Sequence, residues 1–244
     1  MRFTDKICLV TGGTSGIGRA ACVRLAAEGG TIIALSRDRA DGAETVRLIR
    51  KAGGMALFLF CDLAKPRAVA ATVKKVLARY HRVDVLVCDA AIMTFDHLVD
   101  LPLPRWDALM LVNLRSVVQL TQLCLPHMPR GSAIVAISSV HAHRTTAGVV
   151  PYAASKGGLE AFVRGLSQEL DRRQTRINAV APGAVDTPML WNNPNVKNGT
   201  ETIDKAAVGT PEELAAAIAF LAAPEASFVH GTTLVVDGGR LAQL

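Results

Sequence analysis

The sequence predicts an α/β fold in which helices cover both faces of a doubly wound, mostly parallel sheet of seven strands. Short β-branched runs alternate with longer helix-patterned segments along the whole chain, as in repeated βαβ units. Half of the 244 residues are apolar, which is enough to bury a large core, but only 5% are aromatic. The core is therefore built mainly from small aliphatic side chains, as in a sheet covered by helices.

The first half of the chain contains four expected strands, each followed by a helical pattern. An apolar run forms the first strand, and the helix after it places Ala20, Ala21 and Leu25 on its apolar side. Asp38 is the expected N-cap of the second helix, with Asp41 in its first turn. The expected strands cover 7–10, 31–35, 56–60 and 83–88, and the helices cover 17–28, 40–51, 65–80 and 106–125.

The second half continues the series with strands over 133–137, 176–180 and 232–236 and helices over 153–172 and 211–223. Thr210 is the expected N-cap of the last helix, and Pro211 is its first residue. No linker or change in composition divides the chain, so residues 1–244 are expected to form one domain. Residues 182–209 are long and irregular, which is typical of a lid or binding loop, and 184–209 is the expected substrate loop.

Charge and cysteine content exclude several classes of protein. The 27 Lys+Arg exceed the 21 Asp+Glu by six, but they lie as scattered singles and pairs among acidic residues, and aromatic side chains for base stacking are few. We therefore expect no nucleic-acid partner. The five cysteines are odd in number and widely spaced, which indicates reduced core residues and neither disulfides nor a metal site. No run approaches the roughly 18 apolar residues of a membrane span, so a cytoplasmic protein without a membrane partner is expected.

A glycine-rich turn follows the first strand. Gly12, Gly16 and Gly18 have the spacing Gly-x3-Gly-x-Gly, with Thr14, Ser15 and Ile17 between them. Glycines let the backbone approach a pyrophosphate, and the positive end of the following helix attracts its charge. The alternative is an ordinary glycine turn, but the flanking strand and helix favour a dinucleotide site of the Rossmann type.

Three residues of the second half can carry acid/base chemistry. Ser139 follows the fifth strand at its carboxyl end, where doubly wound sheets bind ligands. Tyr152 and Lys156 are four residues apart and so share one face of a helix. A phenol has an ordinary pKa near 10, and a neighbouring ammonium would lower the pKa of Tyr152 toward the range useful for proton transfer.

With these motifs the sequence resembles the short-chain dehydrogenase/reductase (SDR) family, in its compact single-domain branch. The likeness spans almost the whole chain, and the motifs are highly specific in this order and spacing. It rests on Thr11-Gly12-x3-Gly16-Ile17-Gly18, Asp62, Asn113, Ser139, Tyr152-x3-Lys156, Asn178-x3-Pro182-Gly183, Thr187 and Val236-Asp237-Gly238-Gly239.

The resemblance implies hydride transfer between a nicotinamide cofactor and a carbonyl or alcohol. Tyr152 would donate or accept the proton and Ser139 would bond the same substrate oxygen, while Lys156 would hold the nicotinamide ribose and Asn113 a relay water. These four are the expected catalytic residues. The expected cofactor contacts are Gly12, Thr14, Ser15, Gly16, Ile17, Gly18, Ser36, Arg37, Asp62, Leu63, Ala90, Ala91, Tyr152, Lys156, Pro182, Gly183, Val185 and Thr187.

The residues that end the second strand bear on the choice of cofactor. In the family, the acid typical of NAD enzymes sits at the position of Ser36, and NADP enzymes often have a base at that of Arg37. This favours NADP(H). NAD remains the alternative, because Asp38 stands near the usual interval from the glycines and Ser15 is not basic.

One segment departs from the family pattern. Cys88-Asp89-Ala90-Ala91 stands where the family usually has Asn-Asn-Ala-Gly. An acid near the cofactor must be paired or be neutralised by a raised pKa, so we expect weakened cofactor binding and intact catalytic residues.

Several alternatives stay open. A 3-oxoacyl-thioester reductase is a narrower version of the enzyme, and a non-catalytic nucleotide sensor or scaffold is a different class, favoured by Cys88-Asp89-Ala90-Ala91. Enoyl reduction is disfavoured, since relatives that carry it out have a longer interval between Tyr and Lys. Met189, Leu190 and Trp191 either line a substrate pocket or pack the loop, and His141 and His143 are expected to be ordinary loop histidines. The resemblance also implies a homotetramer or homodimer.

Overall fold

The computed structural model describes residues 1–199 and 202–243, and a single seven-stranded sheet forms its centre. The strand order is β3-β2-β1-β4-β5-β6-β7, and every neighbouring pair is parallel. The predicted sheet of seven strands is confirmed, and it is parallel throughout. The strands are β1 Ile7–Thr11, β2 Thr31–Ser36, β3 Met55–Phe60, β4 Val85–Cys88, β5 Ser132–Ile137, β6 Thr175–Pro182 and β7 Thr233–Val236.

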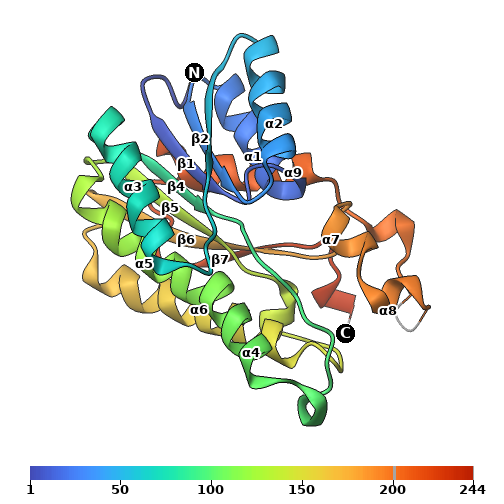
Figure 1. The fold of residues 1–244 in the computed structure, drawn as a ribbon. Coiled ribbons are helices and arrows are strands. Elements are labelled where there is room, and N and C mark those ends of the chain that lie inside the picture. Colours follow the sequence, from blue (N-terminus) through green and yellow to red (C-terminus); the bar gives the residue numbers. More distant parts are fainter. Residues whose placement is uncertain (200–201, 244) are drawn as a thin grey trace.

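Helices cover both faces of the sheet (Figure 1). One core cluster joins the sheet to α1, α2 and α9, and the other joins it to α3, α5 and α6. The α-helices are α1 Gly16–Ala27, α2 Arg39–Lys51, α3 Pro66–Tyr80, α4 Leu103–Met110, α5 Ser116–Cys124, α6 Val150–Glu169, α7 Pro188–Trp191, α8 Pro194–Lys197 and α9 Pro211–Ala222. Short 3₁₀ turns lie at Leu98–Asp100, Leu125–His127, Val140–Ala142, Lys205–Ala207, Pro224–Ala226 and Leu241–Gln243.

The strand order creates a crevice at the carboxyl ends of the central strands. β1 pairs with β2 on one side and with β4 on the other, so the chain changes direction across the sheet at β1. Thr11 is in register with Leu35 of β2 and with Cys88 of β4, so these three strands end level with one another. Ligands of doubly wound sheets bind at such a switch point.

Two expected helix starts are confirmed by their caps. The Asp38 carboxylate accepts a hydrogen bond from the Asp41 amide at 2.9 Å. Thr210 and Glu213 form a reciprocal capping box ahead of α9, with Pro211 in the first turn. Each such cap contributes about 1 kcal/mol to stability. The predicted caps of α2 and α9 therefore hold in the folded chain.

Two segments differ from the predicted pattern. The helix expected over 106–125 is interrupted by a π-helical turn at Leu111–Arg115, between α4 and α5. Asn113 lies in this turn and bonds outside the helix, which favours the wider backbone geometry. The irregular stretch contains two short helices, α7 and α8, because Thr187 and Asn193 cap proline-initiated turns there.

By length and composition alone, one helical stretch could cross a membrane, although polar residues interrupt its apolar sequence. It covers Leu103–His127 and includes Asn113, Arg115 and Gln119. Its apolar side is used within the fold, where Val117, Leu120 and Cys124 pack in the core with α3 and α6. The apolar composition of this stretch is explained by its packing against the sheet in the core.

The five cysteines are free and buried, as the sequence predicts. Cys8 and Cys22 belong to the cluster under α1 and α9, and Cys61, Cys88 and Cys124 belong to the cluster on the opposite face. Burial raises the pKa of the Cys124 thiol to about 12. The thiols therefore act as small apolar side chains of the core.

Candidate active site

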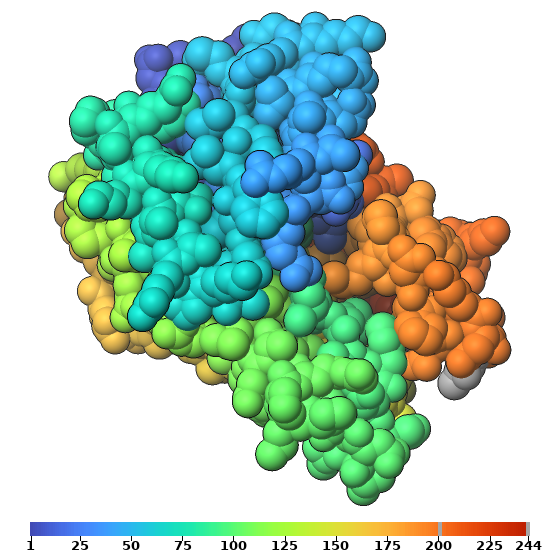
Figure 2. Space-filling view, viewed as in Figure 1, coloured from blue at the N-terminus to red at the C-terminus, as the bar shows by residue number. Residues whose placement is uncertain are grey.

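A cavity of about 410 Å³ lies at the carboxyl ends of the central strands. Figure 2 shows a hollow in this region between the N-terminal half of the chain and the orange segment that contains α7 and α8. Predicted site residues from both halves line the cavity. They are Gly12, Thr14, Ser15, Gly16, Ile17, Ser36, Arg37, Asp62, Leu63, Ala90, Ala91, Ser139, Tyr152, Lys156, Pro182, Gly183, Val185 and Thr187.

Gly18 and Asn113 are the predicted site residues that do not line the cavity. Gly18 lies behind the turn, where an added Cβ would be 2.3 Å from the Gly12 carbonyl oxygen. Its glycine is needed so that α1 can pack against the turn. Asn113 also lies outside the cavity, where its side chain contacts the loop after β4 and α6.

The Asn113 side chain is held by three hydrogen bonds. Its Nδ2 donates to the Ile92 carbonyl at 2.9 Å and to Ser155 Oγ at 3.1 Å, and its Oδ1 accepts from the Ile92 amide at 2.8 Å. The side chain therefore ties the loop after β4 to α6, and its amide group is fully used in doing so.

The glycine turn fits a dinucleotide phosphate. Gly12 and Gly16 have φ of +67° and +46°, a region that favours glycine. A Cβ on Gly16 would lie 2.9 Å from the Thr187 methyl carbon, so a side chain here would meet the loop after β6. Ser15, the N-cap of α1, makes no side-chain capping bond, and the first turn of α1 has no acidic residue. The helix end thus presents its amides and positive dipole to the cavity.

Ser139, Tyr152 and Lys156 meet on the cavity wall below this turn. The Lys156 Nζ lies 5.5 Å from the centre of the Tyr152 ring and donates a 2.6 Å hydrogen bond to the Ile137 carbonyl. Ser139 is the second residue after β5, and its hydroxyl bonds with the Tyr152 phenol. All three side chains are buried. The structure therefore brings together three residues that are 13 and 4 positions apart in sequence.

Three further polar residues support this group and were not predicted from the sequence. Ser138 Oγ donates to the Glu160 carboxylate at 2.7 Å, and Glu160 also pairs with His143 at 3.2 Å. Ser155 Oγ donates to the Tyr152 carbonyl at 2.7 Å while it accepts from Asn113. Two of these residues are sequence neighbours of Ser139 and Lys156, and that adjacency is the signal that could have found them.

Comparisons with known proteins agree with this geometry. Residues 12–240 match a family model described as enoyl-(acyl carrier protein) reductase. The chain is 37% identical to the 3-oxoacyl-(acyl-carrier-protein) reductase FabG of Thermotoga maritima, over 98% of this chain and 99% of that protein. It is 35% identical to a cyclopentanol dehydrogenase of Comamonas testosteroni, over 99% of each.

The solved structures include a short-chain dehydrogenase from Burkholderia cenocepacia in complex with NADP. It is 34% identical, with 98% of each chain covered and a TM-score of 0.89. The chain belongs to the SDR family. As an SDR protein it is an oxidoreductase, of the kind that acts on hydroxyl and carbonyl groups.

The pKa of Tyr152 differs from the sequence expectation. Burial raises the pKa of Tyr152 to about 12, and the hydrogen bond with Ser139 acts in the opposite direction. Burial also lowers the pKa of Lys156 to about 8. The predicted lowering of the phenol pKa is therefore wrong for this structure, because loss of hydration on burial is the largest effect on the phenol and the Asp89 charge acts in the same direction.

The residues after β2, Arg37 and Asp38, face different surroundings. Arg37 is exposed and lines the cavity. Asp38 does not line it, because its carboxylate caps α2, and Asp41 of the same turn pairs with Arg19 at 2.8 Å. The Arg37 guanidinium therefore lies at the cavity, whereas the Asp38 carboxylate does not.

Asp89 stands in the segment that departs from the SDR pattern. Its Oδ2 lies 2.8 Å and 2.6 Å from where a Cβ would stand on Gly12 and on Gly18. Burial raises the pKa of this carboxyl to about 7, while Lys156 and the Gly18 amide act in the opposite direction. A raised pKa is one of the two outcomes that the sequence analysis expects for this acid, and the carboxyl changes charge near neutral pH.

The outer wall of the cavity comes from the loop after β6 and from the turn after Ser139. Met189 and Leu190 line the cavity, whereas Trp191 does not and donates instead to the Asp186 carboxylate at 2.6 Å. His141 also lines the cavity, with its ring edge-on to Tyr152 at 5.9 Å. His141 therefore stands closer to the reacting groups than the sequence analysis expects.

Proposed function

We propose that this chain is an NADP(H)-dependent oxidoreductase that transfers a hydride between the nicotinamide and a carbonyl or alcohol substrate. The observation that carries the proposal is the meeting of Ser139, Tyr152 and Lys156 on the wall of one cavity, below a glycine turn suited to a dinucleotide phosphate. When bound, the cofactor supplies or accepts the hydride. One cofactor-binding domain over residues 1–244 would contain the whole site.

Tyr152 is the proposed proton donor in the reducing direction. A phenol with a pKa of about 12 is protonated at neutral pH, so it holds the proton that a forming alkoxide needs. Ser139 bonds the phenol and faces the same cavity, and it would hydrogen-bond the substrate oxygen. Lys156 is anchored by the Ile137 carbonyl and would hold the cofactor ribose.

Asn113 is proposed to act by position. Its amide group is occupied by Ile92 and Ser155, so a relay water would have to bind the main chain of the π-helical turn. The side chain itself holds the loop after β4 against α6 and thereby keeps Tyr152 and Lys156 in place.

NADP(H) is the proposed cofactor in preference to NAD(H). The exposed Arg37 guanidinium would bind the 2′-phosphate, and the Asp38 carboxylate that could bind a ribose hydroxyl is used as a helix cap. The structural relative from Burkholderia cenocepacia is described in complex with NADP, which supports the same choice.

The proposed substrate is a small-molecule carbonyl or alcohol, with Met189 and Leu190 forming part of the apolar wall. The names of the relatives support two versions of it. The Thermotoga maritima protein is a reductase of 3-oxoacyl groups on a carrier protein, and the Comamonas testosteroni protein is a dehydrogenase of a cyclic alcohol. A 3-oxoacyl-thioester reductase is the narrower alternative.

The experiment that tests the proposal is turnover of NADPH with a panel of ketones, aldehydes and 3-oxoacyl thioesters. Tyr152→Phe removes the acidic proton and should lower kcat by about 10²–10⁴-fold. Tyr80→Phe is the matched control, because Tyr80 is the other tyrosine and ends α3 away from the cavity. Full activity of Tyr152→Phe would refute the assignment.

A non-catalytic nucleotide sensor or scaffold is the second candidate function, and Asp89 favours it because an acid stands beside the glycine turn, in the segment that departs from the SDR pattern. NADPH titration by fluorescence separates the two. A sensor binds NADPH and turns over no member of the panel, whereas the enzyme does both.

We also propose a homotetramer or homodimer in the cytoplasm. Exposed apolar side chains near the C-terminal end suit a subunit interface. They are Phe220 in α9 (40% exposed), Phe228 in the turn between α9 and β7 (84%) and Val235 in β7 (39%). The five free cysteines suit a reducing compartment. Light scattering checks the mass, and a monomer would contradict the assembly.

A further inference from the structure

A second cavity, of about 320 Å³, lies at the amino ends of the central strands, on the opposite edge of the sheet from the active site. Its lining comes from segments that precede or begin β1, β4, β5 and β6 and from the turn after α9. These residues are Phe3, Lys6, Asp84, Val85, Arg130, Gly131, Arg172, Arg173, Arg176, Pro224 and Ser227. Five of them are basic and one is acidic.

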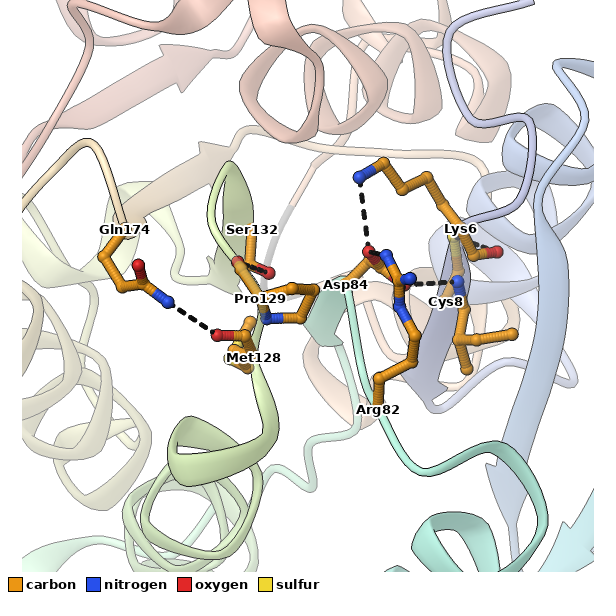
Figure 3. Close-up of polar contacts among 9 residues, drawn as sticks. Lys6, Cys8, Arg82, Asp84, Met128, Pro129, Ser132 and Gln174 are labelled. Atoms are coloured by element: carbon orange, nitrogen blue, oxygen red, sulfur yellow. Dashed lines mark hydrogen bonds and ion pairs between the residues drawn. The ribbon is translucent and has the colours of Figure 1, made fainter.

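The one acid of this lining is already neutralised. Figure 3 shows Asp84 between Lys6 and Arg82, with its carboxylate also facing the start of β1. Lys6 Nζ lies 3.2 Å from Asp84 Oδ1, Arg82 forms a second ion pair with Asp84, and the Ile7 amide donates to Asp84 Oδ2 at 2.9 Å. The charge of Asp84 is therefore balanced by Lys6 and Arg82 and does not compensate the arginines of the cavity.

Four arginines remain without an acidic partner. Arg130, Arg172, Arg173 and Arg176 form no ion pair with any residue in the described ranges 1–199 and 202–243. Arg172 is half-buried and bonds the Ser227 carbonyl at 3.2 Å, while Arg130 and Arg173 are exposed. Like charges that converge on one cavity repel each other and raise the local concentration of anions.

Arg176 gives this cavity a buried cationic floor. Only 3% of its surface is exposed, and its guanidinium donates to the Leu221 and Ala223 carbonyls at 2.7 Å and 2.9 Å, at the end of α9. The helix end offsets part of the charge, equivalent to about half an elementary charge. Burial lowers the pKa of Arg176, because the interior disfavours its charged form.

The chain segments around the cavity are tied together. Figure 3 shows Gln174 reaching across to Met128, and its Nε2 donates to the Met128 carbonyl at 3.0 Å. The Gly131 amide donates to the Gln174 carbonyl at 2.9 Å, and Ser132 Oγ bonds the Pro129 carbonyl at 2.5 Å. The loop that carries Arg130 is thus held against the loop that carries Arg172 and Arg173, so the arginines converge before any ligand arrives.

We propose that this cavity binds a phosphate-type oxyanion, either free phosphate or the phosphate group of a small ester. Guanidinium groups match the oxygens of phosphate in pairs, and several of them around a half-enclosed space give both charge and geometry for that group. The site lies across the sheet from the glycine turn and does not depend on the proposed oxidoreductase function.

The test is calorimetric titration of the full chain with inorganic phosphate, and separately with phenyl phosphate, at ionic strength held constant with chloride. We expect saturable binding that weakens at least tenfold in Arg172→Gln/Arg173→Gln. Arg130→Gln/Arg173→Gln is a second variant in which both residues are exposed, so its folding does not depend on them. Arg67→Gln/Arg164→Gln is the matched control, since both arginines are exposed and lie outside the two cavities.

The outcomes distinguish a phosphate ester from the free phosphate ion as the ligand. They also show whether the second cavity binds phosphate at all. Phenyl phosphate that competes with inorganic phosphate indicates an ester ligand, and binding of inorganic phosphate alone indicates the free ion. Equal binding by the cavity variants and by the control variant would overturn the proposal, because phosphate would then be bound elsewhere, such as at the glycine turn. Absence of saturable binding to the unmodified chain would overturn it as well.

Discussion

Replacing Asp89 by Asn should change how the stability of the protein depends on pH. The Asp89 carboxyl has a pKa of about 7 in the folded chain, against an ordinary value of 3.8. Between these two values the folded state keeps a proton that the unfolded state has released. The free energy of unfolding therefore falls as pH rises through this range, and it levels off above about pH 7. Asn carries no titrating group and lacks this dependence.

The magnitude follows from the shift. Each pH unit in the range costs about 1.4 kcal/mol of stability, so a shift of about three units corresponds to roughly 4 kcal/mol in total. Between pH 5 and pH 7, the difference in unfolding free energy between Asp89→Asn and the unmodified chain should grow in favour of the variant by about 2 kcal/mol. The cause is burial of the carboxyl against the glycine turn, next to Gly12 and Gly18.

The assay is urea unfolding followed by circular dichroism at pH 5, 6, 7 and 8, with the midpoint and slope fitted at each pH. Asp107→Asn is the control, because Asp107 is an exposed carboxylate on α4 without an ion pair in the described part of the chain. Its difference from the unmodified chain should stay nearly constant. A constant difference for Asp89→Asn over the same range would refute the reasoning, since Asp89 would then titrate alike in both states.

Three other predictions concern the cavity and the turn. Asp89→Asn should tighten NADPH binding about tenfold at pH 8 and less at pH 6, because the carboxylate repels the anionic cofactor only when ionised; fluorescence titration at both pH values measures this. Arg37→Ala should weaken NADPH binding by about 10–100-fold and leave NADH binding nearly unchanged, and equal losses for the two cofactors would contradict the role of Arg37. Gly18→Ala should lower the unfolding free energy by about 2–3 kcal/mol, because its Cβ would meet the Gly12 carbonyl. Gly165→Ala is the control and should not destabilise the chain, because nothing lies within 4 Å of the added Cβ. Thermal or urea unfolding of both variants measures the difference.

Much of the site could be predicted from local sequence. The glycine turn is recognisable because a tight approach of backbone to phosphate restricts residue type at Gly12 and Gly16. Tyr152 and Lys156 are one helical turn apart, so their shared face follows from helix geometry alone. The caps at Asp38 and Thr210 are equally local, and both hold in the structure.

Other features depend on contacts between distant segments. The interruption of the helix at Leu111–Arg115 is tied to the bonds of Asn113 with Ile92 and Ser155, 21 and 42 residues away. The pKa of Tyr152 depends on how deeply the fold buries the phenol, and no spacing in the sequence reports that burial. The expectation of a lowered pKa was therefore wrong.

The sequence by itself determined the order of strands and helices and the glycine turn, because each depends on propensity and spacing within a few residues, and the resemblance to the SDR family named the candidate acid/base residues. Only the tertiary structure decided which charges converge. Arg130 is more than 40 residues away from Arg172 and Arg176 in sequence, yet parallel strands bring these segments to one edge of the sheet and leave them around one cavity. Electrostatic interactions depend on distance in space, and the fold sets that distance.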